Sequence, residues 1–370
     1  ASISRFGPRR LNTINDKRKE DLKVYKEDVE VGNKYRDAYY DGIEGFIDRL
    51  VKESARKRRD FAQEILKNPE LYREKFTEML GAPLTEKGRG GVPSVRKTFV
   101  VKSGEVSIYR MQIDVFDIPF YGILFVKEDN KKRPFVIVQH GGLGSPEVCG
   151  NLLEIGSENY NDIVNRVLKY DINVFAPQLL LWRKEFSRDA GSTEEAYTDT
   201  MRHRIDNRLK QFGSSVTALE IYCLVRAIDY FEQQPYVDKS KIGMLGMSYG
   251  GFYTLYTTAA EKRIKCCLSC AFFNDRIKYN WTDWVWFNSG NTFTDIETAL
   301  LIYPRKLYLC VGKADELFDI RSATETWETL KAVMPDNFAH FEQFDGIHEF
   351  LKEDDTSLKM FIHDLCEDNA

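Results

Sequence analysis

The sequence predicts an α/β fold, in which helices flank a mostly parallel central sheet and a helical extension comes first. Beyond residue 134, short apolar runs alternate with amphipathic stretches of helical period, which is typical of strand–helix–strand units. Before that point, residues 97–127 alternate apolar and polar positions and are rich in β-branched and aromatic side chains, as antiparallel strands are. We therefore expect two or three antiparallel strands that lead into a parallel sheet.

The apolar runs and helical patterns give the expected order of elements. The expected strands are FVIVQH (135–140), INVFAPQ (172–178), KIGMLGM (241–247), IKCCLSC (264–270), KLYLCVG (306–312) and FAHFEQF (338–344). The expected helices cover residues near 158–169, 214–234, from 249 onward, 321–333 and 349–364. Such alternation predicts a sheet that is covered by helices on both faces.

The N-terminal segment has a different pattern from the rest. Residues from about 10 to 80 are rich in charge, and their apolar residues recur at helical spacing. This spacing is clearest at Ile43, Phe46, Ile47, Leu50 and Val51. Asn68-Pro69 and the run GAPLTEKGRGGVP mark breaks. We therefore expect residues 1–90 to form a helical extension that caps an active site or mediates homo-oligomerisation, and residues 91–370 to form a catalytic domain.

Charge and hydropathy exclude several classes of partner. The net charge is -4, so the chain offers no overall positive field for nucleic acid. No stretch approaches the roughly 20 apolar residues that span a bilayer, so we expect no membrane association. The first residues lack the apolar core of a signal peptide, which favours the cytoplasm, although a removed export signal stays an alternative.

The seven cysteines favour a reducing compartment, because most lie inside apolar runs rather than in loops at disulfide spacing. Cys267 and Cys270 form a C-x-x-C, but no second Cys or His pair at ligand spacing lies nearby. We interpret them as buried strand cysteines and expect no metal site.

The sharpest motif is G-x-S-x-G, at Gly246 to Gly250, between the apolar run KIGML and the helical GFYTLYTTAA. A serine on a tight strand-to-helix turn needs flanking glycines to avoid clashes, and the helix N-terminus stabilises developing negative charge. The motif lies in the context that this chemistry requires. It therefore predicts Ser248 as a nucleophile.

A serine hydroxyl needs a base, and the base needs a carboxylate that orients it; here both should follow the serine along the chain. His348 lies in a loop after the last expected strand, whereas His340 lies within that strand and His363 lies in the final helix. Asp315 follows KLYLCVG, at the carboxyl end of a parallel strand, with Glu316 and Asp319 as nearby competitors. We expect Asp315 and His348 to complete the set.

The run FVIVQHGGLG predicts the oxyanion hole, which needs one N–H after the nucleophile and another in the loop after an earlier strand. The expected donors are the N–H groups of Tyr249 and Gly142. His140 lies after the wrong strand to act as the base, so we expect it to shape the loop.

With these residues in place, residues of about 95 to 365 resemble the α/β-hydrolase superfamily. The segment PYVDKSKIGMLGMSYGGF is similar to branches that contain dienelactone hydrolases, acetyl xylan esterases and the catalytic domains of prolyl oligopeptidases. The resemblance implies ester or amide hydrolysis without a cofactor. It also implies that Ser248 attacks the acyl carbon, that His348 transfers the proton and that Asp315 holds the imidazole.

Three hypotheses about function follow. The first is an esterase for a small carboxylic ester, with an acylated carbohydrate as one substrate. The second is a serine peptidase of the prolyl oligopeptidase type; only about 90 residues precede the catalytic part, too few for a propeller of several blades at roughly 40 residues each. The third is a hydrolase fold without activity that serves as a scaffold, which the intact Ser, Asp and His set disfavours.

Residues 272–293 form an unusually aromatic insertion between two expected strands, near the sheet edge where the active site should open. Its side chains could either line a substrate pocket or pack in the core. The candidates are Trp281, Trp284, Trp286 and Phe287. Trp182 is a second candidate for the pocket wall, and Arg183 is either a ligand for a substrate carboxylate or an exposed surface residue.

Overall fold

A computed structural model of the chain describes residues 26–86, 88, 90–129, 131–156, 158–182, 199–352 and 356–368. The chain divides into two compact units, residues 1–52 and 53–370. The boundary that the sequence predicts near residue 90 lies inside the second unit.

Two helices precede the sheet, α1 (Val29–Lys67) and α2 (Pro69–Leu80), and Asn68 separates them where the sequence predicts a break. Pro69 begins α2, a position where proline costs no hydrogen bond. In residues 29–52, the large apolar side chains of α1 are exposed, including those of Tyr39, Phe46 and Leu50.

The helix α2 is part of the main core. Phe76 is fully buried, and its ring lies 5.5 Å from that of Tyr256. The buried Arg73 donates hydrogen bonds to the carbonyls of Ala259 and Leu301. These contacts fix α2 against the helix that follows the G-x-S-x-G turn and against the chain at Leu301.

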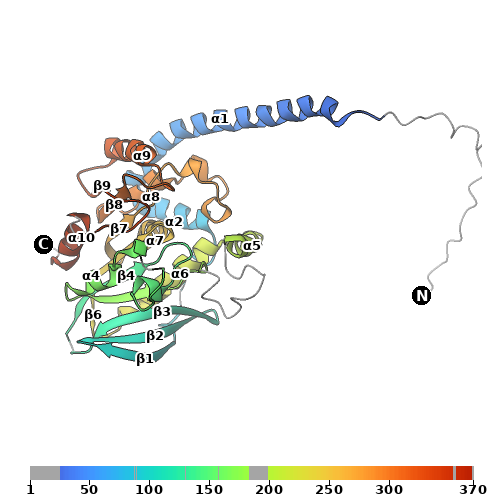
Figure 1. The fold of residues 1–370 in the computed structure, drawn as a ribbon. Coiled ribbons are helices and arrows are strands. Elements are labelled where there is room, and N and C mark those ends of the chain that lie inside the picture. The colour runs from blue at the N-terminus through green and yellow to red at the C-terminus, as the bar shows by residue number, and fades with distance from the viewer. Residues whose placement is uncertain are drawn as a thin grey trace, which may run out of the picture. The chain divides into compact units, whose positions relative to one another are not determined.

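A nine-stranded sheet forms the centre of the second unit (Figure 1). The strands are β1 (Val95–Ser103), β2 (Val106–Val115), β3 (Ile118–Lys127), β4 (Arg133–Gln139), β5 (Asn173–Pro177), β6 (Val237–Met247), β7 (Ile264–Cys270), β8 (Lys306–Gly312) and β9 (Ala339–Phe344). Their order in the sheet is β1-β2-β3-β5-β4-β6-β7-β8-β9. The pairs from β1 to β5 are antiparallel and the pairs from β5 to β9 are parallel, as the sequence predicts.

Helices cover both faces of the sheet, because its parallel strands are apolar on both sides. The helices that follow α2 are α3 (Pro146–Cys149), α4 (Ile163–Leu168), α5 (Asp199–Lys210), α6 (Val216–Phe231), α7 (Tyr249–Ala260), α8 (Asp295–Leu300), α9 (Ile320–Val333) and α10 (Thr356–Cys366). Short 3₁₀ turns lie at Glu158–Tyr160, Arg276–Lys278, Thr282–Trp284 and Ser289–Asn291. Side chains of α2, α6, α7, α8 and α9 share one buried cluster, and those of α3, α4 and α10 share the other.

The two cysteines of the C-x-x-C belong to opposite faces of β7. Cys267 joins the first buried cluster and Cys270 the second, because strand residues three apart point to opposite sides. Burial raises the pKa of Cys267 to about 12, so its thiol stays protonated. This placement agrees with the interpretation as buried strand cysteines.

The final helix begins later than predicted. α10 starts at Thr356, whereas the helical pattern starts near 349. The intervening chain is held as a loop, because Phe350 N–H donates to the Asn159 carbonyl (2.8 Å) and Asn161 Nδ2 donates to the Phe350 carbonyl (2.5 Å). This loop follows His348 directly.

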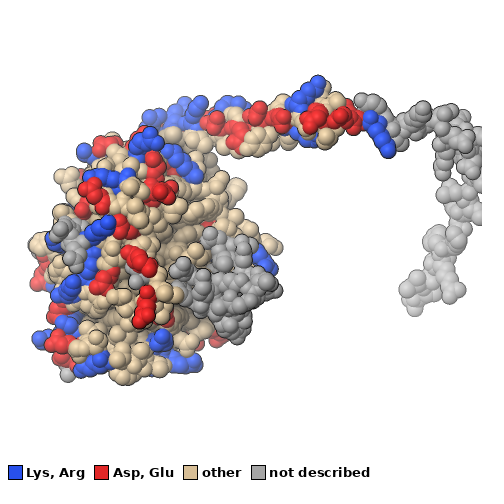
Figure 2. Space-filling view, viewed as in Figure 1, with Lys and Arg blue, Asp and Glu red and all other residues tan. Residues whose placement is uncertain are grey.

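Positive and negative side chains alternate over the face of the molecule in Figure 2, among the residues that are described. That face therefore shows no continuous basic field. None of the described helices is both long enough and apolar enough to cross a membrane.

Candidate active site

Ser248 occupies the turn between β6, which ends at Met247, and α7, which begins at Tyr249. Its φ is 59°, a left-handed conformation that a serine rarely adopts. The serine is 8% exposed, and its N–H donates to the Cys270 carbonyl over 2.9 Å. The strained backbone presents this serine at the carboxyl end of β6.

The flanking glycines are required by close backbone contacts. A Cβ on Gly246 would lie 2.6 Å from the carbonyl oxygen of Gly250. A Cβ on Gly250 would collide with the carbonyl of Gln139. The motif therefore packs against the end of β4 with no room for a side chain at either glycine.

His348 and Asp315 form a hydrogen-bonded pair at the carboxyl ends of β9 and β8. The distance from His348 Nδ1 to Asp315 Oδ2 is 2.9 Å. Asp315 Oδ1 accepts the N–H groups of Leu317 and Phe318, both at 2.9 Å. The Phe318 ring stacks on the imidazole at 5.6 Å. The carboxylate is thus fixed on one oxygen by the backbone and bonds the imidazole with the other.

The competing residues lie elsewhere. Asp319 Oδ1 accepts the Ser322 N–H and begins α9, while Glu316 is exposed. His340 lies within β9, and His363 pairs with Glu367 in α10. Among the predicted candidates, Asp315 and His348 are therefore the ones that meet.

The loops of Ser248 and His348 meet at the end of β7. Cys270 accepts the Ser248 N–H, and its Sγ contacts the Glu349 carbonyl at 3.5 Å. Among the described residues, no hydrogen bond joins the Ser248 hydroxyl to the His348 ring. Such bonds often form only when substrate is bound.

The glycine loop after β4 packs against the serine turn. A Cβ on Gly141 would lie 3.2 Å from Ser248 Cβ, and one on Gly142 would lie 3.1 Å from the Tyr249 ring. Gly141 N–H donates to the Tyr160 hydroxyl (3.0 Å), whereas Gly142 N–H makes no hydrogen bond within the described chain. Of the two, Gly142 is therefore the one whose N–H has no hydrogen-bond partner among the described residues.

His140 holds this loop in place. Its Nδ1 lies 2.6 Å from the Gly141 carbonyl, and its Nε2 accepts the Leu179 N–H over 2.9 Å. These partners require the neutral ring with a proton on Nδ1. Burial lowers the pKa of His140 to about 4. The residue is a structural link between two loops, which agrees with the role expected from the sequence.

We expect His140 to make stability depend on pH. Because its pKa falls from 6.5 to about 4 on folding, its neutral form stabilises the native state above pH 6.5. That stability should fall by about 3 kcal/mol as the pH drops from 6.5 to 4. Urea unfolding across this range should show a flatter dependence for His140→Gln, which cannot titrate. Equal slopes in both proteins would contradict this assignment.

Two of the aromatic candidates are buried rather than part of a pocket. Trp284 is 1% exposed and Trp286 is 8% exposed, and both belong to the core cluster around Phe252. Trp286 Nε1 also donates to Ser215 Oγ (3.3 Å). Their assignment as substrate residues is therefore corrected to core packing, because apolar rings surround both indoles.

Trp281 has a different position. It is 38% exposed, and its ring stacks on that of Tyr249 at 6.0 Å with an interplanar angle of 4°. Phe287, in contrast, is 99% exposed. The Trp284 ring also lies beside that of Tyr249, at 4.8 Å, but Trp281 is the partly exposed one of the two.

Sequence reasoning missed a buried ionic network beneath Tyr249. Arg202, on α5, donates to Asp283 Oδ2 at 2.6 Å and to Glu220 Oε2 at 2.9 Å. It also donates to the Tyr253 hydroxyl over 2.5 Å, and the Tyr249 hydroxyl lies 3.4 Å from Asp283 Oδ1. Burial would raise the pKa of Asp283, but the adjacent Arg202 charge lowers this pKa to about 2. The network thus ties α5, α6 and α7 to the aromatic insertion as paired ions.

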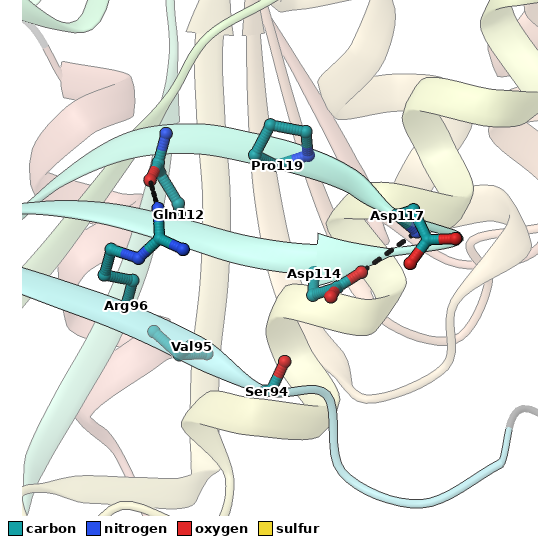
Figure 3. Close-up of a pocket in the computed structure, with 7 residues that line it drawn as sticks. All are labelled: Ser94, Val95, Arg96, Gln112, Asp114, Asp117 and Pro119. Carbon is teal, nitrogen blue, oxygen red and sulfur yellow. Dashed lines mark hydrogen bonds between the residues drawn. The ribbon is translucent and has the colours of Figure 1, made fainter.

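Two of the cavities among the described residues concern the strands β1 to β5. The larger, of about 980 Å³, is lined partly by Trp182 and by residues of the loops after β4 and β5. Arg183 lies outside the described residues. The smaller, of about 460 Å³, lies on β1, β2 and β3, where Arg96 donates to Gln112 (2.9 Å; Figure 3). None of the candidate catalytic residues is among the residues that line either cavity.

Comparison with known families and sequences gives two matches. The prolyl oligopeptidase family matches residues 221–300, which include Ser248 but not Asp315 or His348. A Bacillus subtilis protein named "Putative hydrolase YtaP" is 30% identical over 129 residues, which are 33% of this chain and 43% of that protein. The match therefore spans less than half of the length of this relative.

Solved structures with the same fold cover more of the chain. A glucuronoyl esterase from Solibacter usitatus is 13% identical, with a TM-score of 0.58, over 81% of this chain and 92% of its own. Acetyl xylan esterase 1 from a Thermoanaerobacterium species is 15% identical, with a TM-score of 0.53, over 81% of this chain and 94% of its own. With the strand order described above, these similarities show that the chain has the α/β-hydrolase fold.

Proposed function

We propose that the protein is a serine hydrolase that cleaves carboxylic esters through an acyl-enzyme on Ser248. The observation that carries this proposal is the meeting of three loops at one sheet edge. Ser248 lies on its strained turn after β6, and the hydrogen-bonded pair of Asp315 and His348 follows β8 and β9. This is the arrangement that nucleophilic catalysis by a hydroxyl requires.

In the proposed reaction, Ser248 Oγ bonds to the acyl carbon while its proton moves to His348 Nε2. The bond from the acyl carbon to the alcohol oxygen then breaks, and the alcohol leaves with that proton. Water next attacks the acyl-enzyme and gives a proton to His348, which returns it to Ser248 as the acid leaves. Asp315 keeps the proton on Nδ1 throughout, because its Oδ2 accepts from that atom.

The proposed oxyanion hole consists of the N–H groups of Tyr249 and Gly142. Tyr249 begins α7, so its N–H lies at the positive end of the helix. Gly142 packs against the Tyr249 ring and makes no hydrogen bond within the described chain. Both donors therefore flank Ser248 where negative charge develops.

We further propose that the ester is an acylated carbohydrate, in which the sugar is the alcohol. The fold is shared with a glucuronoyl esterase and an acetyl xylan esterase, whose names give sugar esters as their substrates. Trp281 adds a partly exposed indole beside Tyr249, and such a ring can stack on a sugar. The second candidate, peptide cleavage, is supported by the match of residues 221–300 to the prolyl oligopeptidase family.

Parallel assays of p-nitrophenyl esters and aminoacyl p-nitroanilides distinguish these candidates. We expect hydrolysis of the esters by the wild type and only a small residual rate by Ser248→Ala. Cleavage of the anilides instead would favour the peptidase. Absence of both activities in a folded protein, together with no labelling of Ser248 by a fluorophosphonate, would favour the scaffold without activity.

We also propose where the protein is located and how it assembles. We place the protein in the cytoplasm, because all seven cysteines are free thiols and six are buried. We also propose that the exposed apolar side chains of residues 29–52 mediate pairing with a second copy.

A further inference from the structure

The cavity of about 980 Å³ is large enough for a ligand of drug size, far beyond an acetyl group. It lies between β2 and β3 on one side and α6 on the other, and the loops after β4 and β5 complete it. The apolar part of its wall includes Phe120, Leu180, Trp182, Val216, Leu219 and Cys223.

Several polar groups of this wall already have partners inside the protein, and the half-exposed Arg110 lies 3.9 Å from Glu147. Glu220 Oε1 accepts the Leu180 N–H at 2.6 Å. Glu147 accepts the Tyr121 hydroxyl, and Gln178 Nε2 lies 2.9 Å from His140 Nε2. A polar ligand would have to break these bonds, whereas an apolar ligand would leave them intact. The wall therefore favours an apolar occupant.

The cavity adjoins the glycine loop of the candidate active site. Leu179, in the cavity wall, donates its N–H to His140, which directly precedes the glycine loop. The side chain of Leu181 lies 3.4 Å from the point where a Cβ on Gly142 would stand, beside the Tyr249 ring. One stretch of chain, residues 178–182, thus contributes to the cavity wall and contacts the proposed oxyanion loop.

The strand order decides which half of an ester reaches the cavity. In the sheet, β8 and β9 lie on one side of β6, and β5, β3 and β2 lie on the other. His348 must give its proton to the leaving alcohol, so the alcohol lies on the side of β8 and β9. The acyl group is then directed to the other side, where the cavity is.

We infer that this cavity binds the acyl group of the substrate, and that this group is an apolar chain or ring much longer than acetyl. The inference rests on the proposed ester hydrolysis and names the class of acyl group within it. The substrate class is an ester of a medium-length or aromatic acid.

A series of p-nitrophenyl esters tests this inference, because the leaving group stays constant while the acyl chain grows. From acetate through butyrate to octanoate, kcat/KM should rise by about 10-fold or more, since each buried methylene adds apolar contact. A value that stays constant or falls along the series would overturn the inference.

Two substitutions within the cavity connect that preference to its wall. Leu219→Trp should fill the space beside α6 and lower the ratio of octanoate to acetate kcat/KM about 10-fold. Ile118→Trp, at a position 40% exposed, should act in the same direction with little risk to folding. The matched control is Leu71→Trp on α2, outside the cavity wall, which should keep the wild-type ratio. An unchanged ratio in both cavity variants would mean that another part of the protein sets the acyl-chain preference, and the inference would be overturned.

A binding measurement separates failure of this inference from failure of the proposed function. Ser248→Ala protein can be titrated with methyl octanoate and methyl acetate by calorimetry. Binding of the octanoate alone, lost on adding Leu219→Trp, would support the cavity even if no ester were hydrolysed. No binding of methyl octanoate would overturn the inference, even if short esters were hydrolysed in a Ser248-dependent way.

Discussion

Ser248→Ala should lower kcat/KM for p-nitrophenyl esters by about 10⁵-fold, because the substitution removes the atom that forms the acyl-enzyme. The residual rate should be the part that binding and the oxyanion donors provide without a nucleophile. Folding should be preserved, since the Ser248 N–H and carbonyl bonds to Cys270 and Phe252 belong to the backbone. The free energy of unfolding should change by less than about 1 kcal/mol.

Ser240→Ala is the matched control for this measurement. Ser240 lies near the start of the same strand, β6, where its hydroxyl donates to Asp238 at 2.6 Å. This variant should retain wild-type turnover. If Ser248→Ala kept more than about one tenth of the activity, another nucleophile would have to be sought.

Asp315→Asn should lower kcat about 10⁴-fold, because it should reverse the tautomer of His348. Oδ1 of Asp315 accepts two backbone N–H groups, from Leu317 and Phe318, so the amide oxygen of an asparagine must take that place. The amide NH₂ would then face His348 Nδ1, which would have to accept a hydrogen bond. Nε2 would carry the proton and could not accept the one from Ser248.

Asp319→Asn provides the comparison, since both aspartates lie in the same loop. Asp319 only begins α9, and asparagine is an equally good residue at that position. Its kcat should stay near the wild-type value. A loss of less than about 10-fold in Asp315→Asn would remove Asp315 as the orienting residue.

Local patterns predicted most of the fold. The apolar runs gave the parallel strands, because a strand buried on both faces must be apolar throughout. Asn68-Pro69 predicted the break between α1 and α2, because proline cannot continue a helix that precedes it. The predicted start of α10 was wrong. Residues 349–352 have a helical pattern, but they form hydrogen bonds with the loop around Asn161 instead of joining the helix. Hydrogen bonds to residues far away in the sequence thus outweighed the local helical preference.

The sequence likewise predicted some residues of the candidate site and not others. Glycine spacing and chain order indicated Ser248, Asp315 and His348, since each depends on its place at the end of a strand. Burial of Trp284 and Trp286 could not be predicted, because aromatic spacing is the same in a pocket and in a core. The partners of Arg202 lie as far as 81 residues away in the sequence, so no local signal indicated the network.

The order of the strands separates the residues for proton transfer from those proposed to bind the acyl group, in the sequence as well as in space. The residues proposed to transfer the proton come from the segment after β8, and the wall of the cavity comes from segments before β6. Recombination or drift in the earlier segments can therefore change which acids are accepted while proton transfer stays intact. The protein is in this sense a modular starting point for selecting new ester specificities, with residues 118–120 and Leu219 as the positions to randomise.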